Sequence, residues 1–418
     1  MKTGREVKTI ESIWIVNHYA GGPGIGTGWR HYELGRRWAQ TGVSVRVFAA
    51  STRIGGEQCP KRVGDREIDG VHLHFVPTRT YGGNGISRVL NLSDFARRVG
   101  ARMRGIALAC ATAPSAIIAS SPQPFVWAGA ARIARETGGL FVPEIRDVWP
   151  DSLIELGGMS AFHPLVLASR IAQSRALRRA DLLFSPLSRI SLLGKQFGIA
   201  EDRCIVVPNG SSLAPRAPRL PRTCDQGQRT LLYAGAMGLP NSLDGLVDAV
   251  VGMTQSIRAN LRVLMVGDGT QRLAIEARAK HECPGVFEFL GALDQPAVQS
   301  LAATCDAGVI NWQPMPLYRY GISPQKVPMY LSEGLPIVSA SPDENDCVRT
   351  HQLGWWSPAG ETRALTANLE VFVNADANAL ATMRERCVNY AHEHFNWDGI
   401  AEKGLEALRH IGRHAQVQ

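Results

Sequence analysis

The segment YRYGISPQKVPMYLSEGLPIV, residues 318–338, places a single cation, Lys326, at the start of a predicted helix. Ser323 begins this helix with Pro324 at its first position, a normal start signal. The helix ends at Gly334, before the apolar strand LPIVSA. Free N–H groups at a helix start and a lysine both attract anions. The segment therefore predicts a diphosphate pocket in which the backbone supplies the other donors.

A glycine-rich loop, HYAGGPGIGTGW at residues 18–29, follows a predicted strand and precedes a predicted helix. Glycines in this place let the backbone approach a ligand closely, and the helix start offers N–H groups to an anion. The loop is not a dinucleotide fingerprint, because VFAASTRIGG lacks the acidic residue expected after the second strand. A turn that only connects strand to helix is the alternative interpretation.

Carboxylates follow two other predicted strands. VPEIRDVWPDS, residues 142–152, places Glu144 and Asp147 where a strand-end carboxylate can orient hydroxyl groups or accept a proton. A pair between Arg146 and an aspartate that holds a turn is an equal alternative. In LMVGDGTQ, Asp268 lies directly before a predicted helix, a position that favours helix capping.

The elements that must position these groups alternate along the chain. Short apolar runs, such as SIWIVNHY at 12–19 and DAGVIN at 306–311, are separated by stretches of helical period. This is the βαβ pattern of parallel sheets covered by helices on both faces. We predict an α/β fold of two Rossmann-like, doubly wound domains, with ligands in a cleft at the carboxyl ends of their strands. The predicted parts are an N-terminal domain at 1–210, a proline-rich linker at 211–229, a C-terminal domain at 230–390 and a helix at 391–418 that returns to the N-terminal domain.

Composition limits the classes of partner and compartment. The 418 residues are 45% hydrophobic and carry a net charge of +8, which suits an anionic partner such as a nucleotide, phospholipid or nucleic acid. The eight cysteines contain no CxxC pair, which is typical of reduced thiols in a cytoplasmic protein. The N-terminus is a poor signal peptide, and no segment approaches the roughly 18 to 20 apolar residues of a membrane helix. We therefore expect any membrane contact to be peripheral.

The motifs NHYAGGPG, EIRDVWPDS, CIVVPNG, LLYAGAMG, LMVGDG, FLGALDQ and GISPQKVPMYLSEGLPIV occur in the order found in family-4 retaining glycosyltransferases, and the chain resembles this family. The resemblance covers nearly the whole chain and is strongest to bacterial enzymes of O-antigen and capsule synthesis. It implies the GT-B fold and transfer of a hexose or N-acetylhexosamine from a nucleoside diphosphate sugar, typically a UDP-sugar, to a polyprenyl-diphosphate-linked acceptor. It implies no cofactor and no metal, and the sequence contains no Asp-x-Asp metal motif.

The resemblance also assigns roles to residues. Ser323 and Lys326 are expected to hold the diphosphate, and the turn near Leu290 to contact the base. Asp147 and His18 are the candidate catalytic groups, on the acceptor side. The donor-binding positions implied are Gly21, Gly22, Gly235, Asp268, Leu290, Arg319, Ser323, Lys326 and Glu333.

The sequence departs from the family pattern at two places. The usual Glu-x7-Glu element would put acids at Gly321 and Met329, and the nearest carboxylate is Glu333, one helical turn beyond Met329. The basic pair usual after LLYAGAMG is absent from GLPNSLDG. We expect Arg319 to supply the missing positive charge.

Two basic helices suggest a membrane partner. Arginines on an anionic lipid surface would bring a polyprenyl acceptor to a protein at the inner face of the plasma membrane, and an ordinary solvated face is the equal alternative. The arginines are Arg97, Arg98, Arg102 and Arg104 in one helix and Arg170, Arg175, Arg178 and Arg179 in the other.

Three rival functions remain open to test. A nucleotide-sugar 2-epimerase can share the two-domain shape but needs no acceptor. A dehydrogenase is disfavoured by the missing fingerprint acid. A nucleic-acid binder is disfavoured because the basic residues are dispersed and aromatic residues make up only 7% of the chain.

Overall fold

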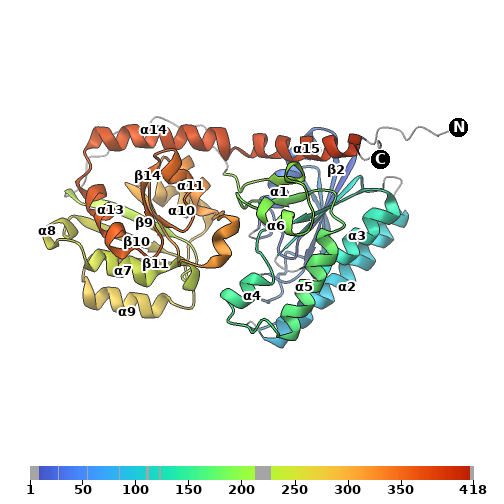
Figure 1. Cartoon of the computed structure of the whole chain (residues 1–418), viewed down its shortest axis with the longest axis horizontal. Coiled ribbons are helices and arrows are strands. Elements are labelled where there is room, and N and C mark those ends of the chain that lie inside the picture. Colours follow the sequence, from blue (N-terminus) through green and yellow to red (C-terminus); the bar gives the residue numbers. More distant parts are fainter. Residues whose placement is uncertain are drawn as a thin grey trace. The chain divides into compact units, whose positions relative to one another are not determined.

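The computed structural model describes residues 9–26, 28–53, 55–83, 85–109, 113–121, 124–211 and 227–414. The chain divides into two compact units (Figure 1). Unit 1 comprises Met1–Pro208 and Trp397–Gln418, and unit 2 comprises Asn209–Asn396. Most of the linker predicted at 211–229 lies outside the described residues.

Unit 1 contains an eight-stranded sheet in the order β3-β4-β2-β1-β5-β6-β7-β8. Neighbouring strands are parallel except β3 and β4, which are antiparallel. The order runs outward in both directions from β1 and β5, as in doubly wound folds. The strands are β1 (Ser12–Val16), β2 (Ser44–Ala50), β3 (Gly64–Ile68), β4 (Val71–Val76), β5 (Ala116–Ser120), β6 (Leu140–Glu144), β7 (Leu183–Ser185) and β8 (Cys204–Val206).

Helices cover both faces of this sheet because its central strands are apolar on both sides. Ile13 and Ile15 of β1 belong to a core cluster with residues of α1 (Arg30–Gln40) and α15 (Trp397–His414). Trp14, which points to the opposite face, packs against Phe48 in a tilted arrangement with ring centroids 5.4 Å apart. The other helices are α2 (Ile86–Ala109), α3 (Phe125–Thr137), α4 (Asp151–Glu155), α5 (Pro164–Leu177) and α6 (Ser191–Gln196). Of these, α3 packs against both α2 and α5 (Figure 1).

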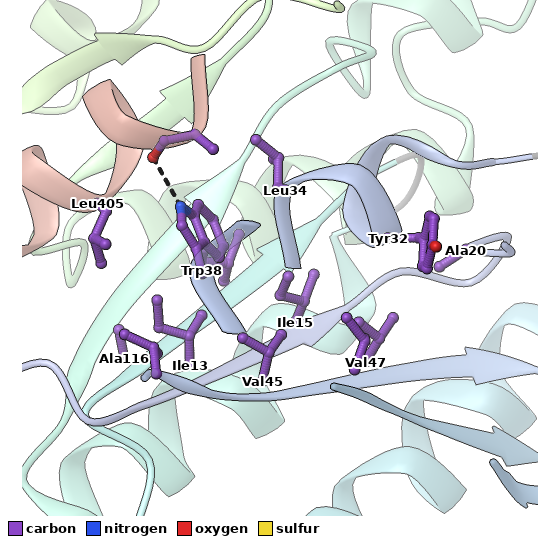
Figure 2. Close-up of a cluster of buried hydrophobic side chains, with 14 of the residues drawn as sticks. Ile13, Ile15, Ala20, Tyr32, Leu34, Trp38, Val45, Val47, Ala116 and Leu405 are labelled. Atoms are coloured by element: carbon purple, nitrogen blue, oxygen red, sulfur yellow. Dashed lines mark hydrogen bonds between the residues drawn. The ribbon is translucent and has the colours of Figure 1, made fainter. Parts of the chain in front are cut away.

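The last helix packs on α1 of unit 1. The Trp38 indole of α1 is 1% exposed and donates a hydrogen bond of 2.8 Å to the Ala401 carbonyl of α15 (Figure 2). Leu405 and Leu408 add apolar contacts to the same cluster. The single helix predicted at 391–418 is in fact the end of α14 (Ala377–His394) followed by α15, because the helix breaks at Phe395 and Asn396.

Unit 2 contains a six-stranded parallel sheet in the order β11-β10-β9-β12-β13-β14. One core cluster joins the sheet to α7, α9 and α13, and a second joins its other face to α10, α11 and α14. The strands are β9 (Arg229–Ala234), β10 (Leu261–Val266), β11 (Phe287–Gly291), β12 (Ala307–Asn311), β13 (Ile337–Ser341) and β14 (Gly354–Pro358). The helices before α14 are α7 (Leu243–Val251), α8 (Gln255–Arg258), α9 (Arg272–Glu282), α10 (Gln295–Ala302), α11 (Lys326–Ser332), α12 (Cys347–Thr350) and α13 (Thr362–Asn374).

The predicted fold class of two Rossmann-like, parallel-sheet domains is confirmed. No helix among the described residues is long and apolar enough to cross a bilayer.

Candidate functional site

The strand order of unit 2 reverses between β9 and β12, and such a switch point is where open α/β sheets bind ligands. The segment that follows β9 is held across this point by one side-chain and one backbone hydrogen bond. The Asn311 side chain, at the end of β12, donates to the Ser242 carbonyl at 2.6 Å. The Gln313 N–H donates to the Pro240 carbonyl at 3.0 Å. The loop 236–242 is thereby held in place beside the carboxyl ends of both strands.

Lys326, the first residue of α11, lies at this switch point. Its Nζ donates to Asn241 Oδ1 at 3.2 Å and lies 4.1 Å from the ring centroid of Tyr233 on β9. A Cβ atom at Gly235 would lie 3.0 Å from Nζ, so glycine is needed for the amine to reach this place. Burial lowers the Lys326 pKa to about 7, and no carboxylate of a described residue opposes this shift. An anion bound here would restore the ammonium form.

Glycine loops after β9 and β10 pack backbone against backbone beside Lys326. The Gly235 N–H donates to the Val266 carbonyl at 2.9 Å, and the Gly267 N–H to the Gly291 carbonyl at 2.8 Å. Gly267 has φ +133°, and a Cβ there would lie 1.9 Å from the Gly235 oxygen. A Cβ at Gly269 would lie 2.4 Å from the Met237 oxygen. Larger residues cannot occupy these positions without moving the loops.

Two predicted donor residues, Ser323 and Asp268, were expected to begin or cap a helix, and neither does so. Helix α11 begins at Lys326, with Gln325 as its N-cap, so Ser323 does not begin the helix. Ser323 is instead held by Asn209, whose Nδ2 donates to the Ser323 carbonyl at 2.9 Å. Asp268 does not cap α9, which begins at Arg272, because the Gly267 turn uses more residues before the helix. Its carboxylate accepts from the Gly269 N–H at 2.8 Å.

The other predicted donor residues of unit 2 lie at separate positions. Arg319 donates to the Pro316 carbonyl at 2.9 Å and stacks on Tyr320, 4.5 Å from the ring centroid. Glu333 is the C-cap of α11, about 10 Å along the helix axis from Lys326. Leu290 is half-buried near the end of the edge strand β11. Their roles in donor binding stay predictions.

In unit 1 the strand order reverses between β1 and β5, and the candidate acceptor residues gather at this second switch point. Asn17, after β1, donates to Ser120 Oγ at 3.0 Å and to the Ser121 carbonyl at 3.1 Å. Ser121 Oγ in turn accepts from the N–H groups of Arg146 at 2.9 Å and Asp147 at 3.1 Å. Ser121, rather than an ion pair between Arg146 and Asp147, therefore holds the turn after β6.

Asp147 is a half-buried carboxylate in this turn. Its Oδ2 accepts a 3.1 Å hydrogen bond from the Trp149 indole. Burial raises the Asp147 pKa, and this effect outweighs the opposing hydrogen bonds from Ser152 and Trp149 and the charges of Arg88 and Arg146. A carboxylate with a raised pKa at a strand end is suited to hydrogen bonding with an acceptor hydroxyl or to proton transfer.

Glu144, the other predicted strand-end carboxylate, is held in buried ion pairs within unit 1. It pairs with Arg30 at 2.8 Å and with His31 Nε2 at 2.7 Å, and all three side chains are buried. Arg30 also donates to the carbonyls of Val207 and Pro208. Burial opposes ionisation of Glu144, yet the charges of Arg30 and His31 keep its pKa well below the ordinary value. This network fixes α1 to β6 and to the segment after β8.

His18 is 1% exposed, between Tyr19 and Phe95, with ring centroids 4.6 Å and 4.5 Å away. The Asn91 side chain is a hydrogen-bond partner of the His18 ring, with loose geometry. Burial, with the charges of Arg62 and Arg88, lowers the His18 pKa to about 3, and Asn91 has a smaller opposing effect. The imidazole is therefore neutral at physiological pH and is a hydrogen-bonding group rather than a cation.

The glycine loop of unit 1 folds back on itself before α1. The Gly21 N–H donates to the Gly28 carbonyl at 3.1 Å, and the Ile25 N–H to the Gly22 carbonyl at 3.0 Å. Gly21 and Gly22 are both buried. Gly28 has φ +89°, and a Cβ there would lie 2.3 Å from the Tyr19 oxygen. The loop is a defined turn, and its contact with donor phosphates stays a prediction.

Several site residues carry no signal in the sequence. Asn241 and Tyr233 contact Lys326 only through the tertiary fold, and Ser121 ends a strand that looks purely structural. Arg62 and Arg88 lie among many other arginines. Among the described residues, no group of three or more His, Cys, Asp or Glu is arranged to hold a metal ion.

Solved structures with the same fold are GT-B glycosyltransferases. Sucrose-phosphate synthase from Thermosynechococcus elongatus has a TM-score of 0.73 at 14% identity, over 96% of this chain and 98% of that chain. HepE from Anabaena, solved with UDP and glucose, has a TM-score of 0.63 at 14% identity, over 95% and 99%. WaaG, a glycosyltransferase involved in lipopolysaccharide biosynthesis, has a TM-score of 0.63 at 15% identity, over 94% and 98%. The fold of this chain is therefore GT-B.

The N-terminal half gives a more particular assignment. Residues 25–210 match the family model described as Glycosyl transferase 4-like domain. No curated protein sequence matches the chain. The resemblance to family 4 is therefore confirmed for residues 25–210, and the chain as a whole has the GT-B fold.

Proposed function

We propose that this protein transfers a hexose or N-acetylhexosamine from a UDP-sugar to a lipid-linked glycan, with retention at the anomeric carbon, in the synthesis of a cell-surface polysaccharide. Unit 2 binds the donor and unit 1 binds the acceptor. The observation that carries this proposal is Lys326, a half-buried amine at the switch point of unit 2 whose pKa is not raised by any carboxylate in the described part of the chain.

Lys326 is suited to a diphosphate leaving group. As the bond to the sugar breaks, negative charge develops on the diphosphate, and a positioned ammonium stabilises that charge. Helix α11 has only seven residues, so anion binding here rests on the Lys326 side chain and on the glycine loops rather than on the helix start. Gly235 leaves room for the amine, and Asn241 orients it.

The identity of the donor and the acceptor is supported by proteins of the same fold. HepE has been solved with UDP-glucose, and the E. coli trehalose-6-phosphate structure with UDP-2-fluoro glucose. WaaG is involved in lipopolysaccharide biosynthesis, and WaaB is a lipopolysaccharide outer core galactosyltransferase. These likenesses favour a uridine nucleotide and a surface glycan.

On the acceptor side, we assign Asp147 to the incoming hydroxyl group. Its raised pKa lets it accept a hydrogen bond or a proton from that hydroxyl while the diphosphate leaves. His18, neutral and buried, orients a polar group of the acceptor. Retention without an enzyme nucleophile requires the acceptor hydroxyl to attack the face of the sugar from which the diphosphate departs.

Helix α5 is the better of the two candidate membrane surfaces. Arg170 and Arg175 of this helix, and Arg178 and Arg179 directly after it, are exposed, and none forms an ion pair with a described residue. Phe162, just before the helix, is 83% exposed, and Ile171 is 52% exposed. By contrast, Arg97 and Arg98 of α2 pair with Asp94. Exposed apolar side chains beside unpaired arginines favour α5 as the contact with anionic lipid at the cytoplasmic membrane face.

The function is tested with a panel of nucleoside diphosphate sugars and a membrane-lipid extract, following nucleotide release and sugar incorporation into lipid. Release together with a lipid-linked product is the expected result, and UDP-sugars should be preferred. Conversion of the free sugar nucleotide without a lipid product would identify an epimerase instead.

Arg319→Ala should weaken donor binding if Arg319 supplies the missing charge, and unchanged binding would contradict that role.

Membrane contact is tested separately by pelleting with liposomes of anionic and of neutral lipid. Binding to anionic liposomes should fall at high salt, because screening weakens surface electrostatics. A double variant, Arg178→Gln with Arg179→Gln, should reduce pelleting, while Arg132→Gln on α3 should not. Salt-insensitive pelleting would contradict the electrostatic contact.

A further inference from the structure

A buried tyrosine on α11 bonds to the strand that leads into the donor loop. Tyr330 lies four residues after Lys326, and residues at this spacing lie on the same side of a helix. The Tyr330 side chain is fully buried, and its hydroxyl accepts a 2.7 Å hydrogen bond from the N–H of Ala234, the last residue of β9. Ala234 directly precedes Gly235, which leaves room for the Lys326 amine. One hydrogen bond thus joins the helix that carries Lys326 to the loop that faces it.

The Ala234 N–H lies where the sheet opens at the switch point. The pairing of β9 with β12 ends at Leu232, two residues before Ala234. Successive N–H groups of a strand point to opposite neighbouring strands. The Gly235 N–H donates to the Val266 carbonyl on β10, so the Ala234 N–H points to the β12 side. Tyr330 therefore supplies the acceptor at the place where the neighbouring strand no longer does so.

The Tyr330 ring is also fitted against β12, the other strand of the switch point. A Cβ atom at Gly308 would lie 2.5 Å from the Tyr330 ring, so glycine is needed there for the ring to fit. Gly308 is itself held in the sheet, where it pairs with Leu232 of β9 and Ile337 of β13. The single Tyr330 side chain therefore fixes α11 against both strands between which the strand order reverses.

The place of the Lys326 amine depends on this attachment. Both of its contacts, the Asn241 side chain at 3.2 Å and the Tyr233 ring at 4.1 Å, belong to β9 or to the loop that follows it. A movement of α11 away from β9 would lengthen both contacts and give the amine more water. The Lys326 side chain is long and flexible, so its own rotamers do not fix the amine.

We propose that Tyr330 is a positioning residue of the donor site, whose hydroxyl holds α11 against the end of β9 and so keeps the Lys326 amine where the donor diphosphate binds. Tyr330 acts through Lys326 and does not touch the donor. The proposal rests on the proposed function, since it deepens the role given there to Lys326. Without the hydroxyl, the buried Ala234 N–H loses its acceptor, and the attached position of α11 loses its advantage over more open ones.

The variant Tyr330→Phe tests this role, because it keeps the ring and removes one oxygen atom. Calorimetry at pH 7, at a temperature where unfolding curves show both chains folded, should give a UDP affinity about five- to tenfold below that of the native chain. Tyr390→Phe is the matched control, since Tyr390 packs against the same core cluster from α14 and contacts His351 and His394. It should leave UDP affinity unchanged. Equal affinity of Tyr330→Phe and the native chain would overturn the proposal.

The ionisation of Lys326 in the free protein gives a readout that a loss of stability alone would not change. Carbon-13 NMR of lysine-labelled protein follows the Lys326 Cε signal, which Lys326→Met assigns. Its titration midpoint in Tyr330→Phe should lie about 1 pH unit or more above that of the native chain, because the amine gains water. Burial raises the pKa values of Tyr330 and Tyr233 above their ordinary value, so neither titrates in this range. Equal midpoints would overturn the proposal.

Amide exchange tests the hydrogen bond itself. The Ala234 amide should exchange at least about tenfold faster in Tyr330→Phe than in the native chain. The reference is Val263 on β10, whose N–H donates to the Val286 carbonyl. Equal acceleration at Ala234 and Val263 would show a loss of stability throughout unit 2 and would overturn the local role.

Failure of the proposed function would give a different result. Absence of UDP binding by the native chain would contradict the donor site. The titration of Lys326 and the exchange of the Ala234 amide use the free chain, so they test Tyr330 without any nucleotide.

Discussion

Donor binding should be coupled to proton uptake by Lys326. Burial lowers the Lys326 pKa to about 7. At pH 8 about nine in ten molecules therefore carry a neutral amine. A bound diphosphate favours the ammonium form and raises this pKa, whereas the terminal phosphate of UDP, with a pKa near ~6, is already ionised at pH 8. Binding of UDP at pH 8 should therefore take up close to one proton per site.

The same shift sets the pH dependence of affinity. The free amine is about half protonated at pH 7 and about one-hundredth protonated at pH 9. If the bound ammonium keeps its proton up to pH 9, UDP affinity should fall by about fiftyfold between these pH values. Lys326→Met should abolish this dependence and weaken UDP binding at pH 7 by about ten- to a hundredfold, as expected for loss of a charge-assisted contact.

Lys326 should also reduce the stability of the free protein. The unfolded chain keeps the lysine proton up to pH ~10.5, whereas the folded chain releases it above about 7. Between these values the unfolded state binds more protons, so stability rises with pH through this window. The full shift corresponds to at most about 5 kcal/mol, and partial exposure of the side chain reduces this to about 1 to 3 kcal/mol. Lys326→Met should be more stable than the native chain by that amount below pH 7, and the difference should close by pH 10.

Calorimetry in two buffers with different ionisation heats gives the number of protons taken up on UDP binding. Lys280→Met is the matched control, because Lys280 is an exposed lysine of unit 2 that pairs with Glu276. It should bind UDP and take up protons as the native chain does. Uptake near zero in the native chain at pH 8, or uptake that persists in Lys326→Met, would refute the role of Lys326.

Three further predictions concern the loops, the last helix and the acceptor side. Gly267→Ala should cost about 2 kcal/mol or more of unfolding free energy and lower UDP affinity, because the added Cβ would lie 1.9 Å from the Gly235 oxygen. Chemical denaturation measures this loss, and unchanged stability would contradict the loop packing. Trp38→Ala should lower the free energy of unfolding by about 3 to 5 kcal/mol in the same measurement, because it leaves a cavity and removes the hydrogen bond to Ala401. A loss under about 1 kcal/mol would contradict a structural role of α15 in unit 1. Asp147→Asn should lower the rate of sugar transfer about a hundredfold or more with UDP affinity unchanged, and full transfer activity would remove Asp147 from the mechanism.

Much of the fold follows directly from sequence pattern. Strands such as SIWIV are apolar at every position because both faces of a parallel sheet are covered, and this pattern predicted the central strands of both units. The edge strand β3, GDREI, was not predicted, because it is mostly exposed and carries no apolar signal. The β14 strand, GWWSP, was also missed, since it is short and only partly buried.

The site was predictable only where one segment supplies it. Lys326 and Asp147 stand out because each lies in a local motif next to a strand or helix boundary. Tyr233 and Asn241 beside Lys326, and Arg62 and Arg88 beside His18, come from segments far apart in the chain. Their proximity depends on strand order and loop packing, which sequence pattern alone does not encode.

Helix starts were the least accurate part of the prediction, for a physical reason. Ser323 and Asp268 are good capping residues, yet each is used by a tertiary or loop hydrogen bond. The Asn209 side chain binds Ser323, and the Gly267 turn delays the start of α9. Local capping preference therefore yielded to contacts that form only in the folded unit.

The most direct test of the donor site is a crystal structure of the protein with UDP. The account predicts the diphosphate at the switch point of unit 2, within hydrogen-bond distance of Lys326 Nζ and beside the Gly235 loop. UDP bound elsewhere, with Lys326 still bonded only to Asn241, would contradict the central claim.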